Sequence, residues 1–163
     1  MTQPVVFDHP DLRVTMHAPP GWIFDDSGIA DGLVIGTAGA PTLMGFHANS
    51  VLIQASLQGQ PEDQQATLAG QQEAETGLVR TLRDYRLLHL DANEFGAPTV
   101  PGVMRSASYT TEEGVPVIFQ QWVARRDGVE VSMTVTFPTA LLPAWNDISL
   151  HMSSALQWKE AAA

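Results

Sequence analysis

Acidic and histidine side chains gather near the N-terminus, in a stretch with the residue types of a metal site. The segment FDHPDLRVTMH holds Asp8, His9, Asp11 and His17, and carboxylates and imidazoles are common zinc ligands. Ligands on one helix face need helical spacing, but Pro10 and the alternating residues after it predict a turn followed by a strand. We therefore expect surface turn residues here and no metal site.

Two further stretches have a partial likeness to ion-binding or phosphate-binding loops. FDDSGIADG is rich in acids, but it lacks the alternating acids and the terminal glutamate of a calcium loop. GTAGAPTLMG is rich in glycine, but no Lys-Ser/Thr pair follows it and Pro41 leads into no helix. We expect turns and loops at both places.

The usual catalytic groups are missing from the sequence. The chain has no cysteine and no G-x-S-x-G motif, and His47, His89 and His151 are scattered singly. A lone histidine is more often structural than catalytic. We predict that the protein is not an enzyme, with no catalytic residue, no cofactor and no metal.

The segment Val115 to Pro138 predicts a β-hairpin around the sequence RDG, with two glutamines and a tryptophan inside its first strand. A two-residue turn, Asp127-Gly128, or a three-residue loop from Arg126 to Gly128 could close it. The three-residue loop matches apolar residues across the strands, with Val123 opposite Val131. We therefore predict the three-residue register, which also sets Val117 opposite Phe137, Phe119 opposite Val135 and Gln121, pointing inward, opposite Met133.

That register predicts a face that mixes aromatic, amide and hydroxyl groups. We take five of its residues as candidate partner-binding residues: Gln120, Trp122, Ser132, Thr134 and Thr136. Two interpretations remain open. A helix covers part of this face and Trp122 packs beneath it with its N–H bonded, or the face is an amphipathic platform for a ligand or protein partner.

One helix is predicted between the strands of the two halves, from Pro61 to about Asp84. One face of this helix is predicted from residues at helical spacing, namely Leu68, Gln71, Glu75, Leu78, Leu82 and Tyr85. A second stripe is small throughout: Ala66, Gly70, Ala74 and Gly77. The small stripe predicts either close packing on a sheet or a flat groove for a partner.

The order of elements predicts an α+β fold with a mainly antiparallel sheet. Strand patterns come first, then the helix, then further strands, and a last helix behind Pro143, which is tolerated in a first turn. The last helix carries Trp145, Ile148, Met152, Ala155 and Leu156 on one face. With no repeat and no linker, residues 1–163 are expected to form a single domain.

Composition narrows the classes of partner. The chain has 163 residues, 44% of them hydrophobic and 16% charged, which is typical of a globular domain. Its formal net charge of −10 repels phosphate backbones and anionic lipid surfaces, so we expect no nucleic-acid and no membrane binding. The opening residues lack the basic and apolar regions of a signal peptide, and we expect a cytoplasmic protein.

Several segments together resemble the PsbP/Mog-like superfamily. They are APPGW after a first strand, HANSVLIQASL, LLHLDANEFGAP, the QQWVARRDGVEVSMTVTF hairpin and the last helix ISLHMSSAL. The branch that the chain resembles most is that of the actinobacterial LpqN/LpqT proteins. The resemblance implies an antiparallel sheet with helices on both faces, an α/β/α sandwich, and a binding or accessory role.

These observations predict a non-enzymatic, cytoplasmic binding or adaptor module that presents a sheet or groove surface to a protein partner. An effector-secretion chaperone is one specific form of it, and a homodimer is compatible with the sequence. The alternative is a small-molecule-binding protein or enzyme with a pocket between the sheet and the helix at Pro61 to Asp84. A deep cavity with converging polar groups favours the alternative, and a shallow groove favours the binding module.

Overall fold

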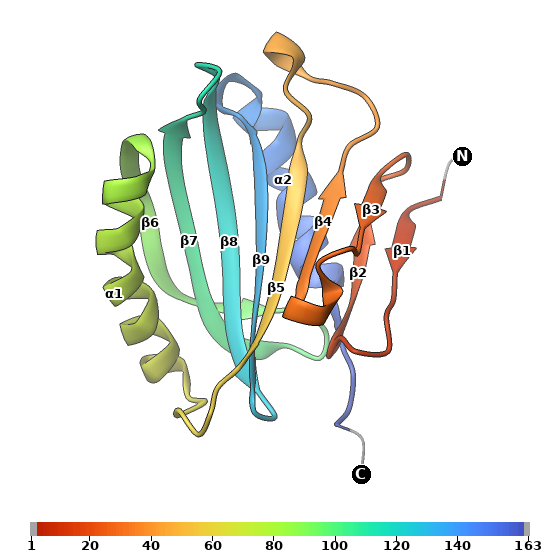
Figure 1. Cartoon of the computed structure of the whole chain (residues 1–163), viewed down its shortest axis with the longest axis vertical. Coiled ribbons are helices and arrows are strands. Elements are labelled where there is room, and N and C mark those ends of the chain that lie inside the picture. The colour runs from red at the N-terminus through yellow and green to blue at the C-terminus, as the bar shows by residue number, and fades with distance from the viewer. Residues whose placement is uncertain (1–2, 162–163) are drawn as a thin grey trace.

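The predicted hairpin lies at the centre of a seven-stranded antiparallel sheet. The computed structural model describes residues 3–161, and the strand order in this sheet is β3-β4-β5-β9-β8-β7-β6. Figure 1 shows the strands side by side. Their bounds are β3 Ile23–Asp25, β4 Leu33–Thr37, β5 Asn49–Ser56, β6 Arg83–Phe95, β7 Val100–Thr110, β8 Pro116–Arg126 and β9 Val129–Pro138.

A smaller sheet and two helices complete the fold. The small sheet joins β1 (Val5–Phe7), β2 (Val14–Ala18) and β10 (Gln157–Trp158), again antiparallel. Helix α1 (Gln64–Thr81) lies on the face of the large sheet that is turned toward the viewer in Figure 1, and α2 (Leu142–Ala155) lies behind the sheet. We call these the front face and the back face. The predicted α+β sheet with helices on both faces is confirmed.

Both predicted helices form, and local chemistry explains where each begins. The carboxylate of Asp63 caps α1 by accepting a hydrogen bond from the Ala66 backbone N–H at 2.8 Å. Pro143 stands in the first turn of α2, where a missing N–H costs nothing. Of the six residues predicted for one helix face, Leu68, Gln71, Glu75 and Leu78 lie in α1 and are half-buried, whereas Leu82 follows the helix and Tyr85 belongs to β6. The buried residue of α1, Thr67, was not predicted. Only half of the small stripe is partly buried, because Ala74 and Gly77 are exposed.

The predicted register of the β8–β9 hairpin is wrong. Val131 lies opposite Ala124 and not opposite Val123, so the turn is the two-residue Asp127-Gly128 turn. Both turn residues have positive φ, 53° and 82°, as in the type I′ turns that match the twist of a hairpin. Pairing apolar residues across the hairpin predicts the wrong register because helices lie on both faces of the sheet. Apolar residues therefore occur on both sides of each strand and do not distinguish the two registers.

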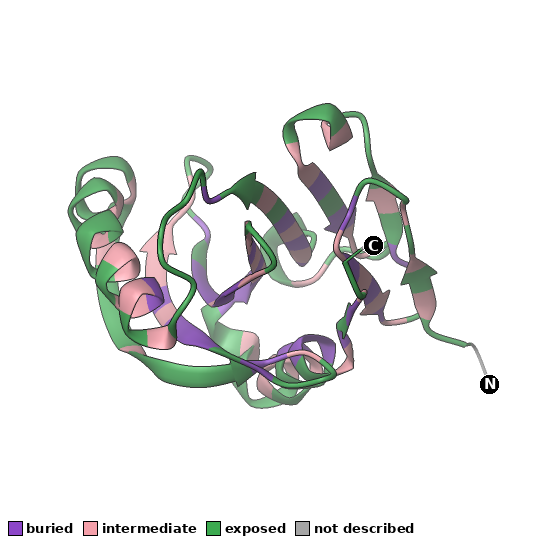
Figure 2. Cartoon of the chain, turned by 90° about the horizontal axis from the view of Figure 1, so that it is seen from below, coloured by how far each residue is buried: buried purple, intermediate pink, exposed green. Residues whose placement is uncertain are grey.

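The largest hydrophobic core lies between the back face and α2. Trp122 is 1% exposed there and belongs to one buried cluster with Met133 of β9 and Met152 of α2. Figure 2 shows buried residues concentrated on the central strands and on the side of α2 that faces them. The front face has its own buried residues beneath α1, including Val103, Phe119 and Val123. The two sides of the sheet therefore differ in how fully they are closed.

Candidate partner-binding groove

Helix α1 covers only half of the front face. It contacts β6, β7 and β8, so on the front face neither of the two helices covers β9, β5 and β4. Residues of β8 and β9 that point to the front include Phe119, Gln121, Thr134 and Thr136. The result is a sheet surface bordered on one side by α1.

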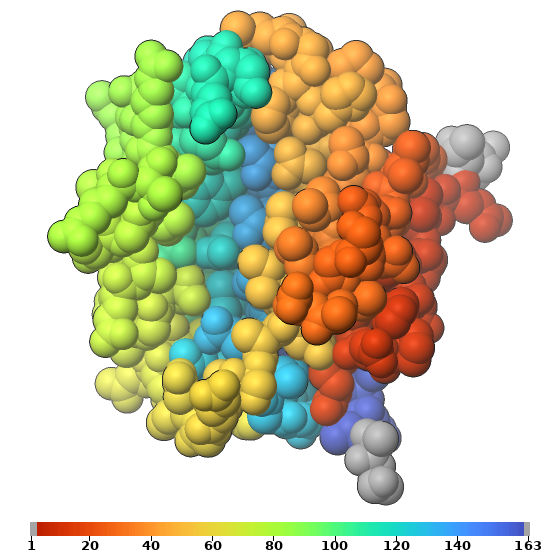
Figure 3. All heavy atoms as spheres, in the orientation of Figure 1, coloured from red at the N-terminus to blue at the C-terminus, as the bar shows by residue number. Residues whose placement is uncertain are grey.

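A shallow groove of about 280 Å³ runs along this border. In Figure 3 the teal and blue strands form its floor, between green α1 and the yellow and orange residues of β5 and β4. Apolar side chains and side chains with hydroxyl or amide groups share the lining, and none carries a charge. The groove is lined by Asn49, Val51, Leu78, Leu82, Tyr109, Phe119, Gln121, Thr134 and Thr136.

Beside the groove, a buried arginine attaches α1 to the sheet. Arg105 of β7 is 2% exposed, and its Nε donates to Glu75 Oε2 of α1 at 3.0 Å. Its Nη1 donates to Gln71 Oε1 at 2.9 Å and to Gln121 Oε1 at 2.6 Å. Because each partner is a protein group held in place, this cluster positions α1 and is not arranged for proton transfer.

Two tyrosines near the groove keep their protons at neutral pH. The pKa of Tyr85 is raised well above its usual value, first by burial and then by the hydroxyl's hydrogen bond to Glu75 Oε1 at 2.5 Å. Burial also raises the pKa of Tyr109. Both rings lie beside Phe119: Tyr85 is stacked on it at a centroid distance of 6.4 Å, and Tyr109 is tilted against it at 6.0 Å. The groove wall is therefore uncharged and aromatic.

Three isoleucines continue the apolar surface beyond the groove. Ile53 of β5 is 44% exposed, Ile35 of β4 is 36% exposed and Ile23 of β3 is 70% exposed. Their cross-strand partners place all three on the front face. We call these residues the isoleucine strip. With the groove they form one front surface that is partly apolar and open to solvent.

The structure separates the five predicted binding residues into two groups. Thr134 and Thr136 line the groove, and Ser132 is on the same front face of β9. Gln120 and Trp122 are on the back face beneath α2, where Gln120 Nε2 donates to Asn146 Oδ1 at 2.9 Å and Gln120 Oε1 accepts from Ser149 Oγ. The platform predicted from all five residues is wrong, because the two-residue turn sends the glutamine and the tryptophan to the other side. The interpretation in which a helix covers Trp122 is confirmed in that respect, whereas a hydrogen bond from its N–H stays a prediction.

Sequence reasoning missed most of the groove. The sequence analysis does not identify the isoleucine strip as a surface, and its register assigns Phe119 and Gln121 to the core. Leu78 and Leu82 were predicted on one face of the helix, and they line the groove at the helix border. The Asp-Gly pair at residues 127 and 128 is typical of a two-residue type I′ turn. That turn fixes the hairpin register, so it could have shown which residues of β8 and β9 point to the front face.

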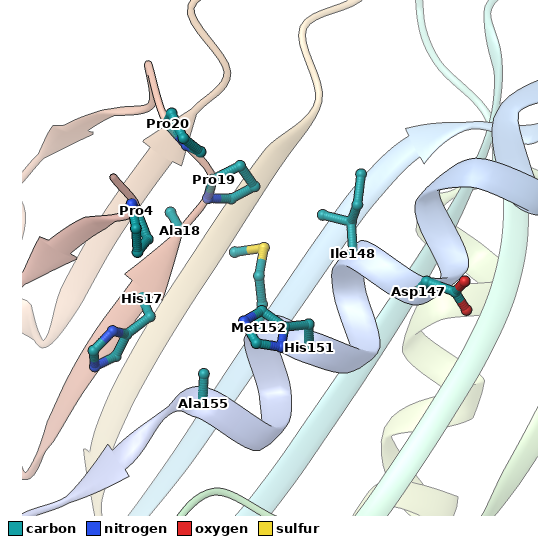
Figure 4. A pocket seen from close by; sticks show the side chains of 10 residues that line it. All are labelled: Pro4, His17, Ala18, Pro19, Pro20, Asp147, Ile148, His151, Met152 and Ala155. Carbon is teal, nitrogen blue, oxygen red and sulfur yellow. The ribbon is translucent and has the colours of Figure 1, made fainter. Parts of the chain in front are cut away.

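A second cavity, of about 440 Å³, lies between β2 and α2. Figure 4 shows Pro19, Ala18, Ile148 and Met152 around it, while the imidazole of His17 and the carboxylate of Asp147 lie at opposite ends. His17 and Asp147 therefore do not converge on one point, and His151 is the third polar residue of the lining. Within residues 3–161, no cluster of three or more histidine, aspartate or glutamate residues could hold a metal, and no helix is long and apolar enough to cross a membrane.

Comparison of the sequence with models of known families finds no match, and comparison with curated proteins finds none either. Solved structures do match. LpqN of Mycobacterium tuberculosis, involved in cell envelope biogenesis, has a TM-score of 0.68 at 13% identity, over 97% of this chain and 91% of that chain. Cyanobacterial PsbP (CyanoP) of Synechocystis sp. PCC 6803 has a TM-score of 0.63 at 13% identity, over 97% and 94%.

The Ran-binding protein Mog1p of Saccharomyces cerevisiae is a more distant match. Its TM-score is 0.54 at 10% identity, over 90% of this chain and 84% of that chain. At these identities the matches show the arrangement of the backbone, and the predicted closeness to LpqN has no support from sequence. The chain therefore has the PsbP/Mog-like fold.

Proposed function

We propose that the protein is a non-enzymatic binding module that holds a protein partner on the groove and the isoleucine strip. The observation that carries this proposal is the asymmetry of the sheet. On the back face, α2 covers the central strands β8 and β9 over a continuous core, whereas half of the front face is left with exposed apolar residues such as Ile53 and Ile35. Exposed apolar area bordered by polar groups is typical of protein interaction sites.

The shape of the groove supports a macromolecular partner over a small molecule. A volume of about 280 Å³ is slightly below the range of about 300–1,000 Å³ that small-molecule sites occupy, and the polar groups beside it are hydrogen-bonded to Arg105. A flat surface that continues over three strands suits a partner with extended contact area. The net charge of −10 favours a partner segment that carries basic residues around an apolar centre.

The cellular setting belongs to the same proposal. A cytoplasmic adaptor fits a chain without cysteine, and a chaperone of secreted effectors is one specific form of it. Mog1p, of similar fold, is a Ran-binding protein, which supports a protein partner in general terms. The absence of a nucleophile and base pair in the sequence supports a role without catalysis.

Two matched substitutions test the proposal. Ile53 on the front face and Leu150 on α2 are each 44% exposed, so an aspartate at either place costs similarly little stability. Affinity capture from the native host with quantitative mass spectrometry is expected to lose the partner with Ile53→Asp and to keep it with Leu150→Asp. Retention of the partner by Ile53→Asp contradicts the proposal, as does a purified chain with an enzymatic turnover that one histidine or acid substitution abolishes.

A further inference from the structure

The outer edge of β6 is a second unpartnered surface, remote from the isoleucine strip. β6 is the last strand in the sheet order, and its 13 residues make it far longer than β3, the 3-residue strand at the other edge. Leu87 is 43% exposed and Leu88 is 55% exposed in its middle. An open strand edge with exposed apolar residues pairs readily with another strand, so proteins cover or protect such edges.

The charges along this edge are arranged as a self-complementary pair. Arg86 lies on the N-terminal side of the leucines and Asp91 on the C-terminal side. Their β7 partners, Ser108 and Met104, show that both side chains leave the sheet on the back face. The pair Arg86 and Asp91 is centred between Leu88 and His89, so two copies of β6 in antiparallel alignment bring each arginine beside the other copy's aspartate.

Two leucines of β6 are arranged symmetrically about the same point. Leu87 and Leu90 pair with Ala107 and Arg105 of β7, so both leave on the front face, and their midpoint is also between Leu88 and His89. An antiparallel pair of β6 strands therefore sets leucine against leucine on one face and arginine against aspartate on the other. A parallel alignment would set like charges together and is disfavoured.

Arg86 has no ion-pair partner within the described residues. Every arginine and lysine of the chain lies in residues 3–161, and all except Arg80 and Arg86 form an ion pair with an acidic side chain there. In a chain with 18 acidic and 8 basic residues, Arg86 on the β6 edge is thus one of two basic residues without an acidic partner among residues 3–161, the other being Arg80 of α1. The aspartate of a second copy supplies the missing partner.

The irregular shape of β6 restricts which strands can pair with its outer edge. The pairing with β7 shifts register between Arg83 and Arg86 and again between Leu87 and His89. The Ala92 and Glu94 N–H groups donate to the Asp91 and Asn93 side chains, at 2.7 and 2.8 Å, so the strand's own side chains occupy part of the edge. A bulged strand edge pairs poorly with a regular, flat strand. A second copy of β6 has the same bulge between Leu87 and His89, so the two irregular edges match at the centre of the contact.

We propose that the β6 edge joins two copies of this chain in an antiparallel, two-fold symmetric contact centred between Leu88 and His89. Such a contact is isologous, because the same patch serves on both copies. It joins the two large sheets through their edges and uses no residue of the groove or of the isoleucine strip. The inference is therefore independent of the proposed function.

Charge exchange across the two-fold axis tests this contact. Sedimentation velocity over a concentration series in about 0.15 M salt, where the repulsion of two acidic copies is largely screened, compares five samples. They are the wild type, Arg86→Asp, Asp91→Arg, the double variant and an equimolar mixture of the two single variants. Both positions are exposed, and unchanged circular dichroism verifies that each variant folds.

The wild type is expected to dimerise, and each single variant to raise the half-association concentration at least about tenfold, because like charges then face each other twice. The double variant is expected to recover the wild-type value, and the two single variants are expected to associate when mixed. A wild type that stays monomeric up to about 100 μM overturns the proposal. A dimer that the single variants leave unchanged overturns it too, and so does a double variant that fails to recover association.

Discussion

At the scale of residues, buried polar side chains of the sheet hold the two helices in place through hydrogen bonds. Gln120 points to the back face, where its amide bonds to Asn146 and Ser149 of α2. Arg105 points to the front face, where it bonds to Glu75 and Gln71 of α1. These two buried side chains each bond to one helix, so each helix has a preferred position on the sheet.

The position of Trp122 gives a residue-scale prediction. Trp122→Ala is expected to lower the free energy of unfolding by roughly 3–5 kcal/mol, because a side chain that is 1% exposed leaves a large cavity beneath α2. Thr134→Val, a change of similar shape on the groove floor, is the control and is expected to stay within about 0.5 kcal/mol. Urea denaturation of the two variants provides the measurement, and a loss below about 1 kcal/mol for Trp122→Ala would show that the core closes without this ring.

At the scale of elements, the β8–β9 turn decides which residues face which helix. Asp127 and Gly128 both have positive φ, and that turn fixes the pairing of the entire hairpin. A shift of one residue moves each side chain to the opposite face relative to its neighbour strand. The groove therefore depends on the geometry of two residues at the far end of the hairpin.

Two glycines give a matched element-scale prediction. A Cβ at Gly128 or at Gly77 meets no atom within 4 Å, so only the backbone distinguishes the two sites. Gly128→Ala is expected to destabilise the protein by about 1–2 kcal/mol because φ is 82° there. Gly77→Ala, in an exposed turn of α1, is expected to stabilise it by about 0.5–1 kcal/mol.

Thermal or urea unfolding of these two variants provides the comparison. The opposite signs are the essential result, since both substitutions add the same methyl group. If Gly128→Ala stabilises the protein as Gly77→Ala does, the turn does not need its left-handed residue, and the explanation of the register fails.

The sequence predicts elements well where they are long and periodic. The sheet-facing residues of α1 recur at helical spacing, and Pro143 indicates the first turn of α2, so both helices are found. Strands of 2 or 3 residues, such as β10 and β1, carry no periodic pattern, and the small sheet is missed. The register is missed because apolar residues on both faces of a covered sheet make two pairings look reasonable.

The candidate site was predicted only in part, for the same reason. Thr134 and Thr136 were chosen as hydroxyl residues on a mixed face, and they do line the groove. Gln120 and Trp122 are candidates only in the three-residue register, which is wrong. In the structure both side chains are buried on the back face. The open half of the front face follows from the absence of a helix over β9 and β5, which only the three-dimensional arrangement shows.

At the scale of the whole molecule, one sheet divides a closed side from an open side. The back face, α2 and the small sheet form a continuous core, while α1 leaves a surface of groove and isoleucine strip on the front. Matches to LpqN, which is involved in cell envelope biogenesis, and to the Ran-binding protein Mog1p show that this backbone arrangement occurs in proteins with different roles. The function therefore has to be sought in the surface of this chain.

Site-specific photo-crosslinking tests most directly whether the partner lies on the front face. A benzoylphenylalanine is placed at Ile35 on the front face or at Leu142 at the start of α2, two positions that are each 36% exposed. Irradiation in the native host, followed by mass spectrometry, is predicted to join one specific protein to position 35 and none to position 142. The same protein joined at position 142 and not at position 35 contradicts the account.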